Sequence, residues 1–549
     1  MPSRPHVLVL GGGYVPITLT RELRRSVSHG EVDVTVVSRD NFHTFHGFIG
    51  EMITGRIGPT SMLSPVRRIF APARAHVAEI ESIGLEARTV VTSRHLDGAR
   101  FELGYDQLVL CLGSSENLDA YPGLAEHAFK LKTYADCLRL KNHVLEMFEL
   151  ADIESDPEER RRLLTFVVAG GGYAGTEIAG ELADFIRLLT AREYSGIRRD
   201  ECRVLIVHPG PNILPELYGS GSTEGQGRGK NYRKLVEYGT RHTRKLGVEL
   251  MLETRVTSAT RDEVFLSNGA QVPTRTIVSA IGTKAPPLFD TIPIPRDARG
   301  RVIVDATLRV VGLENVWAGG DCAAVPHPDG GTCPPVGIYA LKHGTRIGKN
   351  IKRVTQGKQP QPFCYPGLGQ GVSIGGRTGV GELKGIPIRG FFCWLVWRSM
   401  LFYFFPTWDR RLRLLADWTI WPLVGRDIVQ VGRSEGSEYE IRHHVYQPGQ
   451  AIAERARPVR HVHVIVEGEV ELARLDAVIE TLRAGDHFGR KYLEIKGADS
   501  ARARTLVRTV ALRAEQANEL QDVLASAERI MARTGVRPSI PVVGDREVS

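Results

Sequence analysis

Two glycine-rich turns are the residues best suited to chemistry in this chain of 549 residues. In such a turn the first glycine permits a sharp bend, and the next lets the backbone approach a pyrophosphate held at the N-terminus of the following helix. Each turn therefore predicts a dinucleotide site. The glycines in register are Gly11 and Gly13 in GGGYVP, and Gly170, Gly172 and Gly175 in GGGYAGTEIAGEL.

The elements that must position these turns stand on either side of each one. An apolar strand precedes the turn, a helix follows it, and a second apolar strand comes after the helix, which is the order of a βαβ unit. Later apolar runs that end in Gly113 and Gly282 predict strands returning to the same sheets. The first unit is expected at 6–10, 15–27 and 32–37, and the second at 163–169, 174–189 and 203–207.

The end of the second strand departs from the usual dinucleotide pattern in both units. An acidic residue is expected there, because its carboxylate binds the adenosine ribose. Instead Ser38 and Arg39 occupy the first position and His208 occupies the second. These three residues are candidate nucleotide contacts, and an ordinary loop position for His208 stays an equal alternative.

The composition excludes several classes of protein. Hydrophobic residues make up 42% of the chain and charged residues 24%, as in folded soluble proteins. The net charge of +8 on so long a chain does not single out nucleic acid as a partner. The seven cysteines form no CxxC pair and the N-terminus has no signal-peptide pattern, so we expect no metal site and a reducing cytoplasm.

Together these motifs resemble the two-Rossmann flavoprotein oxidoreductases and, within them, the type II NADH:quinone dehydrogenases. The matching stretches stand in the family's order over about residues 5–431. They are VLVLGGGY, VTVVSRDNFHTF, YDQLVLCLGS, LTFVVAGGGYAGTEIAGELADF, VWAGGDCA and CPPVGIYALKHG.

The resemblance implies an α/β fold with two Rossmann-type dinucleotide-binding domains, the second inserted in the first. It implies that the first domain binds FAD, with Asp321 on a ribityl hydroxyl and the helix after Val336 aimed at the flavin, while the second binds NADH or NADPH. The implied FAD contacts are Gly11, Gly13, Ser38, Arg39, Gly113, Asp321 and Val336, and the implied NAD(P)H contacts are Gly170, Gly172, Gly175, His208 and Gly282.

Two further side chains are candidate catalytic residues. The resemblance places Glu177 near the nicotinamide and the acceptor channel, although a solvent-facing helix position is the alternative. On the quinone side the family has glutamines, whereas this chain has Ile338 and His343. His343 is therefore a candidate donor to a quinone carbonyl, with a packing or surface role as its alternative.

An aromatic stretch predicts an amphipathic membrane-anchor segment. Five of the six tryptophans fall between Trp394 and Trp421, and aromatic side chains favour the lipid headgroup region. Six arginines and three aspartates between Arg389 and Asp427 give the sign of charge that anionic lipid attracts. Leu412, Leu415 and Trp418 share one predicted helical stripe. A dimer interface or buried hairpin is the alternative, so a homodimer stays open.

The last part of the chain resembles the cyclic-nucleotide-binding β-roll. YQPGQ, VIVEGEVEL and LRAGDHFGR carry turn glycines at Gly449, Gly468 and Gly485. The glutamate that normally follows Phe-Gly in that family is replaced by Arg490, and Arg502 is a candidate for the phosphate arginine. We expect the fold, and leave open whether this domain binds a cyclic nucleotide, another small ligand or a protein.

The domains are expected at 1–125 with 285–385 for FAD, 126–284 for NAD(P)H, 386–431 for the anchor, 438–534 for the β-roll and 535–549 for a flexible tail. The expected activity is hydride transfer from NAD(P)H to FAD and electron transfer to a quinone without proton pumping, by a peripheral enzyme on the cytoplasmic face of the cell membrane. A flavin-based sensor with weak turnover, and a reductase for another acceptor, are the rival functions.

Overall fold

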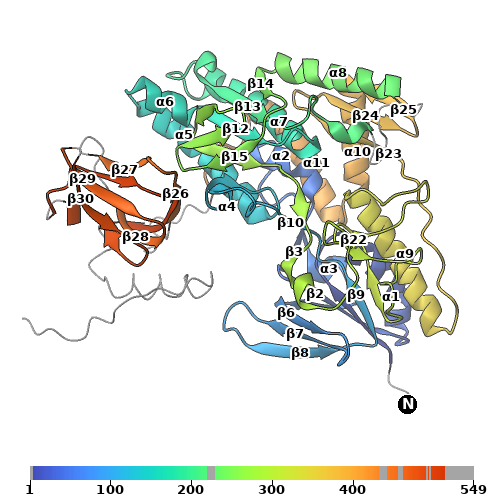
Figure 1. Cartoon of the computed structure of the whole chain (residues 1–549). Coiled ribbons are helices and arrows are strands. Elements are labelled where there is room, and N and C mark those ends of the chain that lie inside the picture. The colour runs from blue at the N-terminus through green and yellow to red at the C-terminus, as the bar shows by residue number, and fades with distance from the viewer. Residues whose placement is uncertain are drawn as a thin grey trace, which may run out of the picture.

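The computed structural model describes residues 4–218, 229–431 and 442–513, the last range with gaps at 455–460, 476, 490–491 and 494–495. Figure 1 shows two α/β units stacked on each other and a separate all-β domain at one side. The expected tail at 535–549 and Arg490 lie outside the described residues. In the described part of the chain, no helix is long and apolar enough to cross a membrane.

The first unit is built on a five-stranded parallel sheet, as the sequence predicts. Its strand order is β21-β9-β1-β2-β5, and apolar side chains on both faces bury it. The strands are β1 (His6–Leu10), β2 (Asp33–Ser38), β5 (Arg74–Val77), β9 (Gln107–Leu110) and β21 (Val316–Ala318). Helix α1 (Tyr14–Ser28) packs against α9 (Gly337–Thr355).

Smaller elements complete this unit around the sheet. An antiparallel sheet is formed by β6 (Glu79–Gly84), β7 (Thr89–Ser93) and β8 (Arg100–Gly104). The others are β3 (Phe42–Thr44), β4 (Leu63–Pro65), β20 (Val302–Ile303), β22 (Ala323–Ala324), α2 (Ile49–Ile53) and α3 (Val66–Ile69).

The second unit repeats the parallel arrangement with the order β11-β18-β12-β13-β14. These strands are β11 (Ala128–Phe129), β12 (Thr165–Ala169), β13 (Arg203–Val207), β14 (Val248–Met251) and β18 (Thr276–Ser279). Its helices are α5 (Tyr134–Ile153), α6 (Pro157–Leu163), α7 (Tyr173–Arg192) and α8 (Gly229–Lys245). A three-stranded sheet adds β15 (Val256–Ala259), β16 (Glu263–Leu266) and β17 (Gln271–Pro273).

A two-stranded antiparallel ribbon joins the two units. It pairs β10 (Ser115–Glu116) with β19 (Thr283–Lys284), so the chain leaves and re-enters the first unit at one place. Helix α4 (Leu124–His127) follows the outgoing strand. The ribbon lies at the expected domain limits near residues 125 and 285, which remain predictions.

The aromatic stretch forms two helices after a small antiparallel sheet. That sheet contains β23 (Gly369–Ser373), β24 (Gly379–Leu383) and β25 (Ile386–Arg389). The helices are α10 (Gly390–Phe404) and α11 (Trp408–Val424).

The structure corrects the predicted lipid-facing stripe of α11. Leu412 and Leu415 are exposed, but Trp418 turns inward and donates its indole N–H to Glu51 at 3.0 Å. The side chains of Arg398 and Arg426 are mostly covered, at 12% and 9% exposure, and form ion pairs with Glu51 and Asp184, and so do not face lipid. The periodicity could not reveal this, because the carboxylates come from distant segments.

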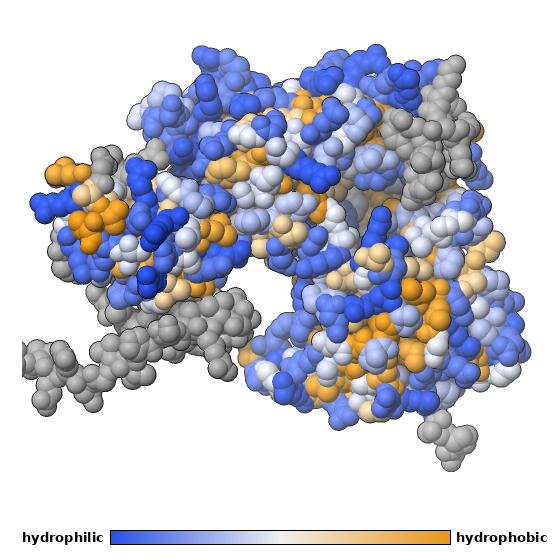
Figure 2. Space-filling view, in the orientation of Figure 1, coloured by the Kyte–Doolittle hydropathy of each residue, from blue (hydrophilic) through white to orange (hydrophobic). Residues whose placement is uncertain are grey.

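The C-terminal domain consists of two four-stranded antiparallel sheets around its own apolar core. One sheet contains β26 (Arg442–Tyr446), β28 (His461–Glu467), β31 (His487–Phe488) and β33 (Val507–Arg513). The other contains β27 (Ala451–Glu454), β29 (Val470–Arg474), β30 (Ala477–Leu482) and β32 (Ser500–Ala503). The three expected turn glycines all have positive φ, between +84° and +97°. Figure 2 shows apolar side chains on the outer end of this domain. Leu475, Val478 and Ile479, in and beside the β29–β30 hairpin, are exposed.

Candidate active site

The first glycine loop lies between β1 and α1, as expected. Gly11 has φ +121°, and a Cβ on it would overlap the carbonyl oxygen of Cys111, the residue that follows the neighbouring strand β9. A Cβ on Gly13 would meet nothing within 4 Å, and no side chain caps the helix that starts there. The open N–H groups at the start of α1 therefore suit a pyrophosphate.

Ser38 and Arg39 occupy different surroundings at the end of β2. The Ser38 side chain is buried directly below Gly12, and its hydroxyl donates to the carbonyl oxygen of Asp40 at 2.8 Å. Arg39 is exposed, with its Nε 3.6 Å from Asp40 Oδ2. The Ser38 hydroxyl proton is thus already used within the protein, whereas the guanidinium of Arg39 is accessible to a ligand.

Asp321 lies beyond the end of β21, beside a lysine that the sequence analysis missed. The Nζ of Lys132 is 4.0 Å from Asp321 Oδ2 and donates to the hydroxyl of Ser114 at 2.8 Å. Ser114 follows Gly113, which has φ +70° and open space where a Cβ would be. Nothing local signals Lys132, since it comes from the connection that leads into the second unit.

His343 lies beneath the Asp321 turn and contacts its backbone. Its Nδ1 accepts the N–H of Gly320 at 3.1 Å, so the neutral ring carries its proton on Nε2. The ring packs edge-on against Phe363 and is 2% exposed, and burial lowers the pKa of His343 to about 3. This position suits a residue that stabilises the turn carrying Asp321. A catalytic role for His343 stays a prediction.

Helix α9 begins next to the first glycine loop. Val336 is its N-cap residue, and no side chain caps the helix. Gly344 allows α9 to approach α1 closely, because a Cβ there would overlap the carbonyl oxygen of Val15. This contact holds the N-termini of both helices near the ends of the parallel strands, where ligands bind in such sheets.

The second glycine loop has the stronger dinucleotide geometry. Gly170 has φ +113°, and a Cβ on Gly175 would overlap the carbonyl oxygen of Gly170. The chain returns at Gly282, where φ is +44°. His208 lies behind the loop and its Nδ1 accepts the N–H of Gly171 at 3.1 Å. His208 therefore supports the loop itself, and any contact with a nucleotide through it stays a prediction.

A carboxylate that the sequence analysis missed occupies the start of α7. Glu216 Oε1 accepts the N–H of Tyr173 at 3.0 Å and lies where a Cβ on Gly172 would be. This is the position at which the dinucleotide pyrophosphate is expected. A negative ligand must therefore displace the Glu216 side chain before it can bind the helix N-terminus.

Glu177 lies on α7 opposite α2, within a group of buried ionisable side chains. Burial, with the nearby carboxylates of Glu181 and Glu51, raises the pKa of Glu177 well above its ordinary value. A carboxyl group with a raised pKa holds its proton to higher pH than an ordinary glutamate does, and can serve as an acid. Both neighbouring carboxylates are paired with arginines: Glu181 with Arg56 at 2.9 Å, and Glu51 with Arg398.

Comparison with known proteins identifies the families of both parts of the chain. Residues 5–343 match the family described as pyridine nucleotide-disulphide oxidoreductase, and residues 443–526 match the cyclic nucleotide-binding domain. Type II NADH:quinone oxidoreductase Ndh of Mycobacterium tuberculosis is 26% identical over 76% of this chain and 88% of its own length. A probable NADH dehydrogenase of Dictyostelium discoideum is 28% identical over 77% of this chain and 90% of its own length.

The solved structures agree with the fold. NDH2 of Plasmodium falciparum in complex with NADH has a TM-score of 0.70 at 17% identity, covering 78% of this chain and all of that one. The resemblance to two-Rossmann flavoproteins stated from the motifs is thus confirmed. Since the first match spans more than half of the residues, the chain belongs to the pyridine nucleotide-disulphide oxidoreductase family.

Proposed function

We propose that this protein is a peripheral membrane flavoenzyme that oxidises NADH and reduces a quinone without pumping protons. The observation that carries the proposal is the pair of glycine-led helix N-termini at the ends of two parallel sheets, that of α1 uncapped and that of α7 covered by Glu216. The relatives named type II NADH:quinone oxidoreductase, which align over most of this chain, support the choice of donor and acceptor.

The residues of the first unit fit FAD. Gly13 leaves space for the pyrophosphate, the carboxylate of Asp321 can accept from a ribityl hydroxyl, and α9 points an uncapped N-terminus towards the same region. When bound, FAD accepts a hydride from the nicotinamide and passes the electrons on. The helix N-terminus would stabilise the negative charge of the reduced ring, and Lys132 would balance the charge of Asp321.

In this proposal Glu177 supplies a proton on the acceptor side. Reduction of a quinone to a quinol consumes two electrons and two protons, so the site needs an acid there. The raised pKa of Glu177 lets its carboxyl group hold a proton to higher pH than an ordinary glutamate does, which suits a proton donor.

The substitution Glu177→Gln separates the two half-reactions. We expect NADH to reduce the flavin at the wild-type rate, while reoxidation by a soluble quinone slows about 100-fold or more, the usual contribution of a positioned acid. Wild-type reoxidation should also slow as rising pH removes the Glu177 proton, and the variant should lack this dependence. Stopped-flow absorbance of the flavin measures both steps.

Glu193→Gln is the matched control for this substitution, because Glu193 is the exposed residue at the C-terminal end of the same helix. It should leave both half-reactions unchanged. Equal reoxidation rates in wild type and Glu177→Gln would remove Glu177 from the mechanism.

Glu216→Gln should strengthen binding of NADH. The substitution removes a negative charge from the helix N-terminus that the pyrophosphate must occupy, so we expect the KM for NADH to fall about three- to ten-fold. Steady-state kinetics measure this with kcat as the reference. Glu249→Gln, on β14, makes the same charge change at a carboxylate that pairs with Arg203 and does not contact the helix N-terminus. A higher KM in Glu216→Gln would show instead that Glu216 binds the nucleotide.

The helix pair α10 and α11 supports the proposed contact with membrane. In a soluble protein large apolar side chains are mostly buried, but here Phe391, Phe392, Tyr403, Trp408 and Leu412 are each more than half exposed. Aromatic side chains of this kind favour the lipid headgroup region. The exposed surface of these helices is therefore the proposed attachment site on the cytoplasmic face of the membrane.

Replacing Phe391, Phe392, Trp408 and Leu412 with serine should abolish flotation with vesicles that contain anionic lipid. Each side chain contributes about 1.5–3 kcal/mol when it leaves water, so binding should weaken by more than about 100-fold. Replacing Leu475, Val478 and Ile479 with serine removes exposed apolar side chains from the C-terminal domain and should change nothing. Retained flotation of the first variant would contradict the proposed surface.

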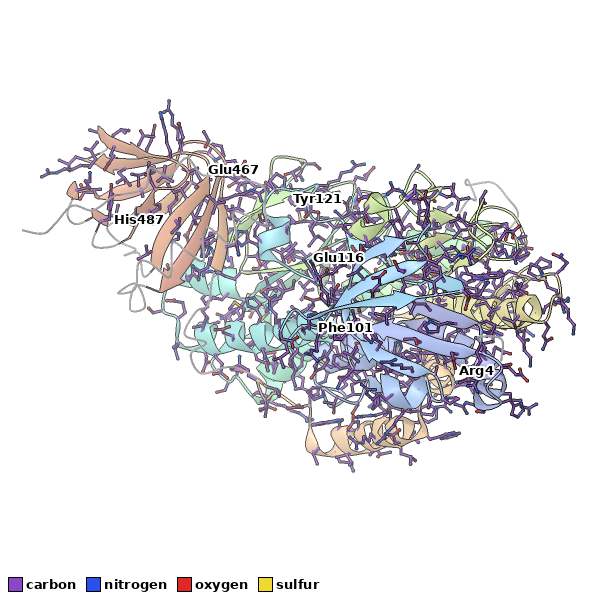
Figure 3. All side chains as sticks on the ribbon, turned by 90° about the horizontal axis from the view of Figure 1, so that it is seen from below. Arg4, Phe101, Glu116, Tyr121, Glu467 and His487 are labelled. Atoms are coloured by element: carbon purple, nitrogen blue, oxygen red, sulfur yellow. The ribbon has the colours of Figure 1, made fainter. Side chains whose placement is uncertain are left out.

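We also propose that the C-terminal domain regulates the enzyme, because it docks on the connection between the two units. The backbone N–H of Val445 donates to His127 Nε2 at 3.0 Å, and Arg508 pairs with Glu126. Figure 3 shows this domain beside the segment that carries Tyr121 and Glu116. A ligand or partner that moved the domain would therefore act on α4 directly.

The docking site is a few residues away from the flavin site along the chain. After α4, the backbone N–H of Leu131 donates to Glu116 on the β10–β19 ribbon at 3.1 Å. The next residue is Lys132, which lies beside Asp321. A shift of α4 would thus change the position of a charge next to the proposed FAD contact.

A double-mutant cycle of Glu126→Gln and Arg508→Gln tests this coupling. We expect each single substitution to change the rate of flavin reduction by NADH, and the double variant to change it no more than either single one. Amide exchange of residues 124–129 should increase in all three. Unchanged rates despite increased exchange would show that docking does not control turnover.

A further inference from the structure

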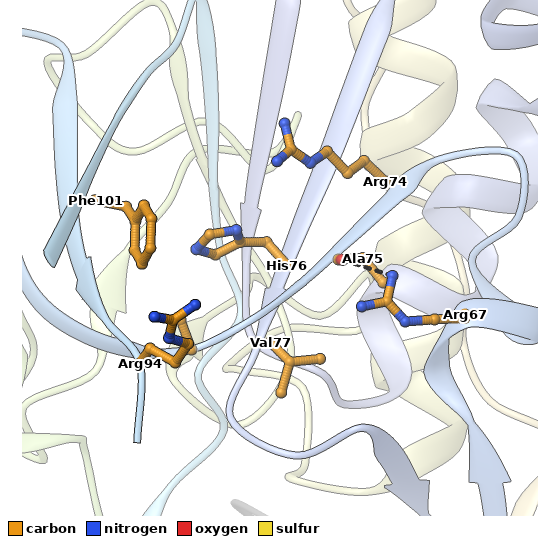
Figure 4. A pocket seen from close by; sticks show the side chains of 8 residues that line it. Arg67, Arg74, Ala75, His76, Val77, Arg94 and Phe101 are labelled. Atoms are coloured by element: carbon orange, nitrogen blue, oxygen red, sulfur yellow. Dashed lines mark hydrogen bonds between the residues drawn. The ribbon is translucent and has the colours of Figure 1, made fainter. Parts of the chain in front are cut away.

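A cavity of about 340 Å³ lies along the outer edge of the first unit, in residues assigned to neither glycine loop (Figure 4). Among the strands that the structure describes, β5 pairs only with β2, and the cavity follows its other, unpaired edge. Its volume lies within the range of about 300–1,000 Å³ that small-molecule sites occupy. The cavity is therefore large enough to hold a small organic ligand.

Three arginine side chains line this cavity. Arg67 comes from α3, Arg74 from β5 and Arg94 from the loop after β7, and no acidic residue lines it. In the described part of the chain, no carboxylate lies within ion-pair distance of Arg67 or Arg74, whereas Arg94 pairs with Asp97. Like charges around one space repel each other, and a bound anion would remove this repulsion.

The guanidinium groups suit a phosphate in particular. Arginine binds phosphate through two parallel N–H donors, which fixes the ligand's orientation as well as its charge. Arg67 Nη1 makes a long contact of 3.4 Å with the carbonyl oxygen of Ala75, and its other donors remain available. Figure 4 shows Arg67 and Arg74 approaching the space from the side opposite to Phe101.

A partly exposed aromatic ring forms the other side of the cavity. Phe101 on β8 is 39% exposed, its centroid lies 5.8 Å from the guanidinium carbon of Arg94, and the His76 ring meets it edge-on at 5.9 Å. A planar heterocycle could stack on the ring face beside this cation. The two sides therefore suit the two ends of one ligand, an anionic group and a flat ring.

His76 lies between these two sides and can respond to an anion. The Thr92 hydroxyl donates to the carbonyl oxygen of Phe101 at 3.3 Å, so it accepts from His76 Nε2 at 3.0 Å. The Nδ1 atom is then the one that takes up a proton. Burial and the charge of Arg74 lower the pKa of His76, and a bound phosphate would act in the opposite direction.

We infer that this cavity binds a nucleotide, with its phosphate on Arg67 and Arg74 and its base against Phe101 and Arg94. The site is separate from the two glycine loops, and the inference does not depend on the proposed electron transfer. Inorganic phosphate could bind Arg67 and Arg74 but has no ring to stack on Phe101. The contribution of Phe101 to binding therefore distinguishes a nucleotide from inorganic phosphate.

Calorimetric titration of the full-length, flavin-loaded protein with ADP and with inorganic pyrophosphate tests the inference. The double variant Arg67→Ala, Arg74→Ala should lose one ADP site, with affinity falling at least about 10-fold, since hydrogen bonds to charged groups contribute about 1.5–3 kcal/mol. Phe101→Leu should weaken ADP while leaving pyrophosphate unchanged. The KM for NADH should stay as in the wild type, which separates this cavity from the second glycine loop.

Arg68→Ala is the matched control, because Arg68 is the next residue on α3 but points to Asp409 outside the cavity. It should bind both probes as the wild type does. Identical ADP binding in all variants would overturn the site. If the double variant lost affinity for ADP and for pyrophosphate equally, and Phe101→Leu had no effect, the assignment of a nucleotide as the ligand would be overturned. The cavity would then be a site for an inorganic anion.

Discussion

A buried group of ion pairs holds together the parts of this protein that its proposed chemistry needs. Arg398 on α10 binds Glu51 on α2 through both carboxylate oxygens, at 2.5 and 2.8 Å, and its guanidinium lies 3.9 Å from the ring centroid of Trp418 on α11. Arg56 and Arg426 both pair with Asp184 on α7. Removing one partner of such a pair costs about 3–5 kcal/mol, because the other charge stays buried.

This junction connects three segments that are distant in sequence. The first unit contributes α2, the second contributes α7, and the helix pair contributes α10, α11 and the residues after them. Glu177 lies on α7 next to this group, and its pKa is raised because it is buried beside the carboxylates of Glu181 and Glu51. The same contacts that fix the proposed membrane surface therefore also set the protonation state of the proposed acid.

Much of the fold could be predicted from sequence because its signals are local. The strand, glycine turn and helix of each unit adjoin one another in the chain, so Gly11, Gly13, Gly170 and Gly172 could be assigned by spacing alone. The helix after Val336 and the three turn glycines of the C-terminal domain could be predicted for the same reason, because their signals are also local in sequence.

What escaped prediction depends on contacts between distant segments. The sequence predicts that Arg398 and Arg426 add to a positive charge that attracts lipid, yet their carboxylate partners lie hundreds of residues earlier in the chain. Lys132 and Glu216 reach their sites from connections whose paths no periodicity describes. His343 shows the same limit, because only the folded chain reveals that its ring contacts the Gly320 backbone.

The central claim is that one flavin accepts electrons from NADH and gives them to a quinone. An anaerobic titration of the purified protein in the presence of lipid measures this most directly, by following flavin absorbance during addition of NADH and then of a soluble quinone. The account predicts bleaching by NADH and rapid recovery with quinone. Bound flavin that NADH does not bleach, or that stays bleached after quinone is added, would contradict it.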